Sequence, residues 1–270
     1  MEQIQIKQKL IEQLIDISKE AGEAILEIYS TNFDYKVKDD SSPLTKADIV
    51  SNNIICERLE SLNPNIPILS EENSEIPFKI RSSWKQYWLI DPLDGTKEFI
   101  KRNGEFTVNI ALIDNMKPVI GVIHAPVLNE TYWGSISEGS FYLKENNQEE
   151  KLCIEKDISN IVTVAVSRSH PSEKLNAFLK KIEGCNIITV GSSLKFCLIA
   201  RGLADIYPRF GPTSEWDTAA GEAILKYSGG EIVTSHAKNI QYNTKNDHIN
   251  PNFIAHNNQL DLVKEWKKII

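Results

Sequence analysis

Two segments near the start of the chain have the residue spacing of amphipathic helices. In the first, apolar residues recur at steps of three and four, which places them on one face of a helix. They are Leu10, Leu14, Ile17, Ala21, Ile25 and Ile28. The second segment runs from Thr45 to Leu62 and ends before Pro64, a residue that stops a helix. We therefore predict two helices before the first strand.

Short apolar runs separated by turn residues follow these helices. Short strand signals lie at residues 66–69 and 87–90. The runs at residues 107–113, 119–123, 131–133 and 140–143 then form a series that is broken by turn residues, which predicts an antiparallel sheet. The polar run 144–151 contains no strong apolar residue, so we predict that an α+β half, residues 1–150, ends there.

The second half, residues 151–270, has a different rhythm. Strand-like and helix-like segments alternate along it, which is typical of an α/β layer. We expect strands at residues 161–167, 186–190, 204–207 and 231–233, and helices at residues 173–182, 193–201 and 217–227. The predicted fold class is α/β, with an α+β N-terminal half and an α/β C-terminal half.

Composition excludes several classes of function. With 270 residues, of which 41% are hydrophobic and 25% charged, the chain has the make-up of an ordinary globular protein. Its net charge of −7 argues against coating a nucleic-acid polymer, which needs a basic stripe. Its four cysteines are too widely spaced for a zinc site or a disulfide framework. Because no apolar run suits a membrane span or a signal peptide, we expect a cytoplasmic protein.

Carboxylates stand at the ends of four predicted elements. They are Asp48 in the second helix, Glu71 and Glu72 after one strand, Asp91 and Asp94 after the next, and Asp217 before a later helix. Each has an ordinary alternative: a first-turn acid for Asp48, solvated loop acids for the glutamates, a polar turn for residues 91–95, and an N-cap for Asp217. Because strand ends of layered α/β sheets gather at one edge, we expect these side chains to converge.

Converging carboxylates repel one another unless cations neutralise them. Hard oxygen ligands suit divalent ions such as Mg²⁺, so the set predicts at least two such ions. Two ions of this kind promote phosphoryl transfer to water, one by making the water more acidic and the other by stabilising the leaving oxygen. Thr96 follows this pair of aspartates, where its hydroxyl either orients the water or closes the turn after Gly95.

The C-terminal half adds groups that suit a phosphate. Ser192 and Ser193 precede a helix, whose unpaired N–H groups attract an anion. Lys195 adds a point charge, and Arg209 adds a guanidinium that can fork onto a phosphate. The alternative for Lys195 and Arg209 is a solvated surface charge. His170 is a further possible phosphate donor, and its alternative is a histidine in a turn. The chain contains no Gly-x-x-x-x-Gly-Lys loop, Gly-x-Ser-x-Gly elbow or His-Glu-x-x-His helix.

Three stretches taken in order resemble the signatures of the inositol monophosphatase superfamily of lithium-sensitive, magnesium-dependent phosphatases. They are Glu-Glu at 71–72, Asp-Pro-Leu-Asp-Gly-Thr at 91–96 and Trp-Asp-Thr-Ala-Ala-Gly at 216–221. The longer stretches 87–114, 191–196 and 207–213 are similar to CysQ-type 3'(2'),5'-bisphosphate nucleotidases within that superfamily. The resemblance covers nearly the whole chain. It implies a layered αβαβα sandwich of the inositol monophosphatase/fructose-1,6-bisphosphatase type, with the site between the two halves.

The resemblance also implies roles for the matching residues. One Mg²⁺ would be held by Glu71, Asp91 and the Leu93 carbonyl, and a second by Asp91, Asp94 and Asp217. A third, near Asp48, Glu71 and Glu72, would bring the number from two to three. Thr96, with Asp48 or Glu72, would activate the attacking water. The substrate would contact Glu71, Leu93, Asp94, Gly95, Thr96, Ser192, Lys195, Arg209 and Asp217.

The implied reaction is hydrolysis of adenosine 3',5'-bisphosphate (pAp) to AMP and phosphate, in sulfur assimilation and nucleotide recycling. A further implied substrate is 3'-phosphoadenylyl sulfate. Two alternatives stay open: an inositol or sugar monophosphatase, for which Lys195 and Arg209 would be superfluous, and a non-enzymatic metal-binding regulator of a macromolecule. We expect a monomer or a homodimer, either cytoplasmic or peripheral on the inner face of the cytoplasmic membrane.

Overall fold

The computed structural model describes residues 8–37, 43–144, 148–154, 161–169, 172–182, 184–235, 239–258 and 260–270. Its helices are α1 (Gln8–Tyr29), α2 (Lys46–Leu62), α3 (Phe78–Arg81), α4 (Thr96–Ile100), α5 (Glu173–Leu179), α6 (Leu194–Ala200), α7 (Glu215–Tyr227) and α8 (Leu260–Lys267). Its strands in the first half are β1 (Tyr35–Val37), β2 (Pro43–Thr45), β3 (Ile68–Ser70), β4 (Gln86–Asp94), β5 (Thr107–Asp114), β6 (Lys117–Ala125), β7 (Glu130–Ser135), β8 (Gly139–Leu143) and β9 (Glu149–Leu152). Those in the second half are β10 (Thr163–Ser167), β11 (Asn186–Val190), β12 (Ile206–Arg209), β13 (Glu231–Thr234) and β14 (Phe253–His256).

A seven-stranded sheet occupies the first half of the chain, with its strands in the order β3-β4-β5-β6-β7-β8-β9. β3 runs parallel to β4, and each later pair of neighbours is antiparallel. The antiparallel succession predicted for residues 107–143 is confirmed in β5, β6, β7 and β8. Residues 149–152, most of which belong to the polar run 144–151, form β9, which was not predicted. Polar side chains suit this position, since β9 is an edge strand. The boundary expected at residue 150 falls within β9, and the division into two halves stays a prediction.

A five-stranded sheet occupies the second half, with its strands in the order β11-β10-β12-β14-β13. β10, β11 and β12 are parallel, whereas β14 is antiparallel to both of its neighbours. The alternation of strands and helices was predicted, but β14 and α8 were not. A smaller pairing of β1 with β2 and the short helices α3 and α4 were also not predicted.

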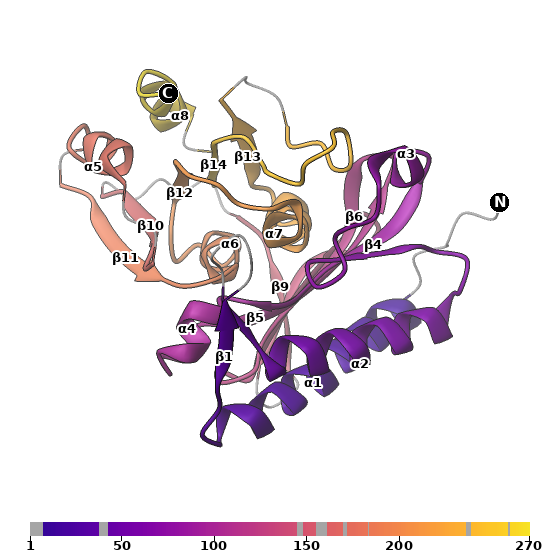
Figure 1. Ribbon diagram of the computed structural model, residues 1–270. Helices are drawn as coiled ribbons and strands as arrows, with labels where there is room; N and C mark the ends of the chain where they lie inside the picture. Colours follow the sequence, from indigo (N-terminus) through magenta and orange to yellow (C-terminus); the bar gives the residue numbers. More distant parts are fainter. Residues whose placement is uncertain are drawn as a thin grey trace.

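The elements stack in five layers, in the order helix, sheet, helix, sheet, helix (Figure 1). α1 and α2 cover one face of the large sheet, where Trp88 and Ile90 point toward them. Tyr87 and Leu89 alternate to the other face, which packs on α6 and α7. α5 and α8 cover the outer face of the small sheet through Phe178 and Trp266. The αβαβα sandwich that the resemblance implied is therefore confirmed.

α7 lies almost directly on the strands of the large sheet. A Cβ atom at Gly121 would lie 2.4 Å from the Ala220 carbonyl oxygen, and one at Gly134 would lie 2.8 Å from the Cα atom of Ile224. Only glycine allows a helix backbone to approach the strands so closely. α7 belongs to the second half of the sequence, yet it packs on the sheet of the first half and carries Asp217 to it.

Candidate functional site

β4 continues through the aspartate pair, where the sequence predicted a turn. Its register with β5 shifts between Asp91 and Asp94, and Pro92 is accommodated there because prolines inside sheets occur at bulges. The Leu93 N–H donates to Asp91 Oδ1 at 3.1 Å. Gly95 follows with a φ of +94°, a left-handed conformation that favours glycine. The strand end is therefore kinked between the two aspartates, and the α4 helix starts directly after it.

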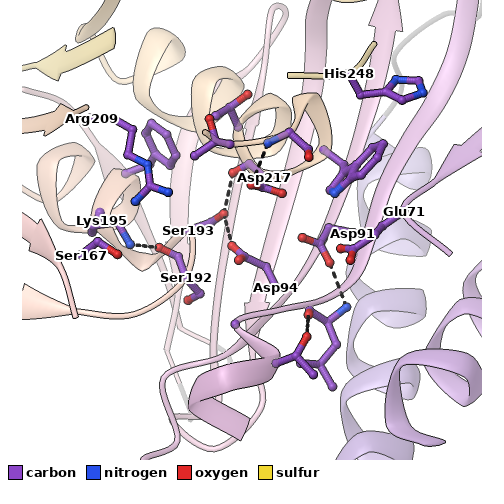
Figure 2. Close-up of a pocket in the computed structure, with 18 of the residues that line it drawn as sticks. Glu71, Asp91, Asp94, Ser167, Ser192, Ser193, Lys195, Arg209, Asp217 and His248 are labelled. Carbon is purple, nitrogen blue, oxygen red and sulfur yellow. Dashed lines mark hydrogen bonds between the residues drawn. The ribbon is translucent and has the colours of Figure 1, made fainter. Parts of the chain in front are cut away.

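Residues of β4, α6, β12 and α7 line a cavity of about 530 Å³. Ten of the predicted site residues line it, namely Glu71, Asp91, Leu93, Asp94, Gly95, Thr96, Ser192, Lys195, Arg209 and Asp217. Figure 2 shows Glu71 and Asp91 on one side of the pocket, Lys195 and Arg209 on the other, and Asp94 and Asp217 between them. Asp48 and Glu72 are not part of this lining. His170 lies outside the described residues.

Asp48 lies behind Thr96 and has two functions. One oxygen, Oδ2, accepts hydrogen bonds from the Thr45 N–H at 2.7 Å and the Thr45 hydroxyl at 2.6 Å, so that Thr45 and Asp48 cap α2. The other, Oδ1, accepts a hydrogen bond from the Thr96 hydroxyl at 3.2 Å. Asp48 is therefore an acidic residue in the first turn of α2, as the ordinary alternative predicted, and it also accepts a hydrogen bond from Thr96. The choice between Asp48 and Glu72 as the partner of Thr96 in activating water stays a prediction.

The ordinary alternative for Asp217 was an N-cap, and this alternative is wrong. Ser214 is the N-cap of α7, and its N–H donates to Asp217 Oδ2 at 2.9 Å in a capping box. α7 consequently begins at Glu215, two residues before the predicted start. The cap fixes Asp217 on the first turn of a helix that lies against the large sheet, so its side chain reaches the same cavity as the strand-end aspartates.

Ser193 and Asn109 hold Asp94 and were not predicted to do so. The Ser193 hydroxyl lies 2.6 Å from Asp94 Oδ2 and 2.8 Å from the Asp217 carbonyl oxygen. Asn109 donates to Ser193 Oγ at 2.9 Å and to Asp94 Oδ2 at 3.3 Å. These contacts join β4, β5, α6 and α7. No sequence signal identifies them, because the partners lie far apart along the chain.

The carboxylates of the cavity have few counter-charges. Burial, followed by the negative charges of Glu71 and Asp94, raises the pKa of Asp91 well above its ordinary value. Burial and the charge of Asp94 likewise raise the pKa of Asp217. Among the described residues, no Lys, Arg or His forms an ion pair with Asp91, Asp94 or Asp217. A cation would relieve this repulsion.

The donor set fits hard divalent cations such as Mg²⁺. Glu71, Asp91, Asp94 and Asp217 supply only oxygen atoms, the kind of ligand that Mg²⁺ prefers. In the part of the chain that the structure describes, no three His, Cys, Asp or Glu side chains lie close enough together to form a group that could hold a metal ion. The predicted close cluster is thus an open one: its members line one cavity without meeting at a single point.

Lys195 and Arg209 are not the solvated surface charges of the ordinary alternative. Their exposed fractions are 3% and 6%. Lys195 Nζ donates to the Ser192 carbonyl and lies 5.1 Å from the Tyr207 ring centroid. Burial, opposed by the Asp94 charge, lowers the pKa of Lys195 to about 8. Arg209 donates to the Pro212 carbonyl at 2.7 Å.

Two buried polar atoms beside these cations have unused hydrogen-bonding capacity. Among the described residues, neither the Arg209 Nε donor nor the Ser192 hydroxyl has a hydrogen-bond partner. Ser192 is also held at a φ of +47°, which is uncommon for a residue other than glycine. Both residues line the cavity. The basic side is therefore equipped to receive an anionic group.

Comparisons with known proteins agree with this geometry. The family model described as the inositol monophosphatase family matches residues 6–269. The 3'(2'),5'-bisphosphate nucleotidase CysQ of Salmonella typhimurium is 44% identical over 246 residues, which are 90% of this chain and 98% of that protein. The crystal structure of CysQ from Bacteroides thetaiotaomicron is similar with a TM-score of 0.81 and 38% identity, covering 93% of this chain and 98% of that chain. A Thermotoga maritima IMPase has the same TM-score at 22% identity, covers 97% of this chain and 98% of that chain, and supports the fold alone.

The chain therefore belongs to the inositol monophosphatase family, as its three signatures predicted. Within that family it falls in the branch of the CysQ-type 3'(2'),5'-bisphosphate nucleotidases. Membership of this family implies a metal-dependent phosphatase. In the described part of the chain, no helix combines the length and the apolar content needed to cross a membrane.

Proposed function

We propose that this protein hydrolyses the 3'-phosphate of adenosine 3',5'-bisphosphate to AMP and phosphate, with 3'-phosphoadenylyl sulfate as a further substrate. One observation carries the proposal: a single cavity has carboxylates on one side and the buried Lys195 and Arg209 on the other. A substrate with two phosphates can place one at each side. The two CysQ relatives described above, one of them named as a 3'(2'),5'-bisphosphate nucleotidase, support the same class of substrate.

The acidic side would hold Mg²⁺. Glu71, Asp91 and the Leu93 carbonyl are the proposed ligands of one ion, and Asp91, Asp94 and Asp217 those of a second; a third would lie near Asp48, Glu71 and Glu72. When bound, Mg²⁺ supplies positive charge to the phosphoryl oxygens and makes a nearby water more acidic. Ser193 and Asn109 orient the Asp94 carboxylate by occupying its Oδ2 atom. The Oδ1 atom of Asp94 would then be the oxygen that binds the cation.

Thr96 and Asp48 would move the proton of the attacking water. The Thr96 hydroxyl donates to Asp48 Oδ1, so its lone pairs point away from Asp48 and can accept a proton from water. As the water attacks phosphorus, its proton would pass to Thr96 Oγ1 while the Thr96 proton passes to Asp48. The bond between phosphorus and the 3'-oxygen breaks, and the departing 3'-oxygen takes up a proton from solvent water. Thr45 holds Asp48 in place for this transfer through its N–H and hydroxyl groups. General-base help of this kind contributes about 10²- to 10⁴-fold in rate.

The basic side would bind the retained 5'-phosphate and the nucleoside. Among the described residues, the Arg209 Nε donor and the Ser192 hydroxyl have no hydrogen-bond partner, and Lys195 adds a positive charge to the same side of the cavity. A charge-assisted hydrogen bond in a buried site is stronger than one in water. An inositol monophosphate would leave these buried groups without a partner, which disfavours the monophosphatase alternative.

A comparison of substrates tests the proposal. Hydrolysis of adenosine 3',5'-bisphosphate, inositol 1-phosphate and fructose 1,6-bisphosphate is measured with Mg²⁺, with and without Li⁺. We expect the bisphosphate nucleotide to be preferred by kcat/KM, and Li⁺ to inhibit. Preference for inositol 1-phosphate would contradict the proposed substrate. Absence of turnover on all three would instead favour the non-enzymatic regulator. The cytoplasmic location and the state of monomer or homodimer remain predictions.

A further inference from the structure

A buried arginine outside the cavity joins the two segments that carry Glu71 and Asp217. Arg81 ends α3, ten residues after Glu71 in the chain, and its exposed fraction is 1%. Burying a guanidinium is costly unless its donors find acceptors. The acceptors of Arg81 come mainly from a loop in the other half of the molecule, residues 243–250. In Figure 1, α3 lies beside this loop.

Arg81 binds the 243–250 loop by four hydrogen bonds. Its Nη1 donates to Asn243 Oδ1 at 2.5 Å, and its Nη2 donates to the carbonyls of Lys245, at 3.0 Å, and Asn246. In return, Asn243 Nδ2 donates to the Arg81 carbonyl at 2.6 Å. The Nε donor is used within its own segment, on the Ile76 carbonyl at 3.3 Å. A planar fork of donors suits such a set of acceptors, whereas an ammonium group does not.

The 243–250 loop also forms hydrogen bonds with the first turn of α7. The Asn243 N–H donates to Glu215 Oε2 at 2.9 Å, and the Glu215 N–H donates to the His248 carbonyl at 2.8 Å. Asn250 Nδ2 donates to the Ser214 carbonyl at 2.7 Å and to Thr218 Oγ1 at 3.0 Å. Each of these contacts lies within three residues of Asp217. The loop therefore fixes the helix turn that presents Asp217 to the cavity.

The same loop also contacts the segment that follows Glu71. His248 Nε2 lies 3.3 Å from the Ser74 carbonyl oxygen, and Figure 2 shows His248 and Glu71 on the same side of the pocket. The chain from Glu71 to Arg81 is thus attached to the 243–250 loop at both Ser74 and Arg81. The 243–250 loop therefore connects the segment that follows Glu71 with the helix turn that carries Asp217.

We propose that Arg81 is a positioning residue for the divalent cation site. Through the 243–250 loop it sets the distance between Glu71 and Asp217, and with it the affinity of the cavity for Mg²⁺. The inference rests on the proposed function only in assuming that these carboxylates hold the cation. Residues that orient metal ligands typically change metal affinity by about 10- to 100-fold when they are replaced.

Two variants separate positioning from simple stabilisation. The Arg81→Lys variant keeps the positive charge but loses the planar set of guanidinium N–H donors. Asn243→Gly removes the side-chain link to Arg81 but keeps the N–H bond to Glu215, and it tolerates the φ of +57° at this position. Arg58→Lys is the matched control, because Arg58 pairs with Glu20 in a largely exposed ion pair. Binding of Mn²⁺, as a spectroscopic probe, is measured by electron paramagnetic resonance on the substrate-free proteins.

We expect both variants to raise the Kd for Mn²⁺ by about tenfold or more, and the control to leave it unchanged. The Mg²⁺ concentration for half-maximal hydrolysis should rise in parallel, while kcat at saturating Mg²⁺ stays within about twofold of the parent value. A folded variant with a lower melting temperature and an unchanged Kd would overturn the proposal. Should Arg81→Lys not fold, Asn243→Gly decides. Parent protein that binds Mn²⁺ but does not hydrolyse the nucleotide would refute the proposed function and leave this inference standing.

Discussion

The two sides of the cavity are built on different principles. The acidic side takes its carboxylates from the ends of β3 and β4 and from α7, and it is repulsive as it stands, since Asp91 and Asp217 have raised pKa values. The basic side takes Lys195 and Arg209 from α6 and β12, and both are already anchored to backbone carbonyls. The acidic side therefore depends on a cation, whereas the basic side is preorganised. Hydrolysis and choice of substrate should accordingly be separable by mutation.

Asp217 is the exception to a simple division into halves. It lies in the second half of the sequence, but α7 packs on the large sheet through the glycines at 121 and 134. The second half thus contributes to both sides of the cavity. A change in the packing of α7 would therefore alter the acidic side, and the 243–250 loop holds the first turn of this helix.

The largest expected effect comes from the acidic side. Asp94→Asn and Asp217→Asn should each lower kcat by about 10²-fold or more on every substrate, because each removes a ligand that stabilises charge in the transition state. The melting temperature of the metal-free protein should stay the same or rise, since one repelling charge is lost. Asp261→Asn, on the exposed face of α8, is the control. A rate near that of the parent in either active-site variant would contradict the metal assignment.

The next effect concerns the proton relay. Thr96→Ala should lower kcat by about 10²-fold, since the hydroxyl between water and Asp48 is lost. Thr96→Ser keeps the hydroxyl and should keep most of the activity. KM should change little in both, as the acidic and basic sides stay intact. The measurement is kcat of both variants from the rate of phosphate release. Equal kcat values for Thr96→Ala and Thr96→Ser would exclude the Thr96 hydroxyl from the proton transfer.

A smaller effect is expected from pH on the basic side. The pKa of Lys195 is about 8, so its ammonium is charged below pH 8 and neutral above it. Raising the pH from 7 to 9 should therefore raise KM for adenosine 3',5'-bisphosphate by about tenfold, through the loss of one charged hydrogen bond. Adenosine 3'-monophosphate should be affected less. The Lys195→Arg variant stays charged at pH 9, so its KM should no longer depend on pH. If KM of this variant still rises between pH 7 and pH 9, the pH dependence comes from another group.

Regular elements could be predicted closely from the sequence. The predicted segment Thr45–Leu62 differs from α2 by its N-cap residue, and the strand 186–190 matches β11. Both depend on local spacing of apolar residues and on capping chemistry. Elements fixed by tertiary contacts were less predictable: α7 starts at Glu215 because Ser214 caps it, and β4 continues past Asp91 because β5 pairs with it.

In the candidate functional site, too, local features could be predicted from the sequence and tertiary contacts could not. The acidic residues were identified by their place at element ends and by the resemblance, and ten predicted residues line one cavity. Their environment could not be predicted, because it depends on packing between distant segments. Burial of Lys195 and Arg209 requires α6 and β12 to lie in the interior. The roles of Ser193, Asn109 and Arg81 require contacts that only the folded chain makes.

The most direct test of the separation between the two sides is a ratio of specificities. kcat/KM for adenosine 3',5'-bisphosphate is divided by kcat/KM for adenosine 3'-monophosphate in the parent protein, Asp94→Asn and Arg209→Met. We predict that Arg209→Met lowers this ratio by about tenfold, equivalent to about 1.4 kcal/mol, while Asp94→Asn lowers both values and leaves the ratio unchanged. A ratio that is unchanged in Arg209→Met, or that falls equally in both variants, would contradict the assignment of hydrolysis and substrate choice to opposite sides of the cavity.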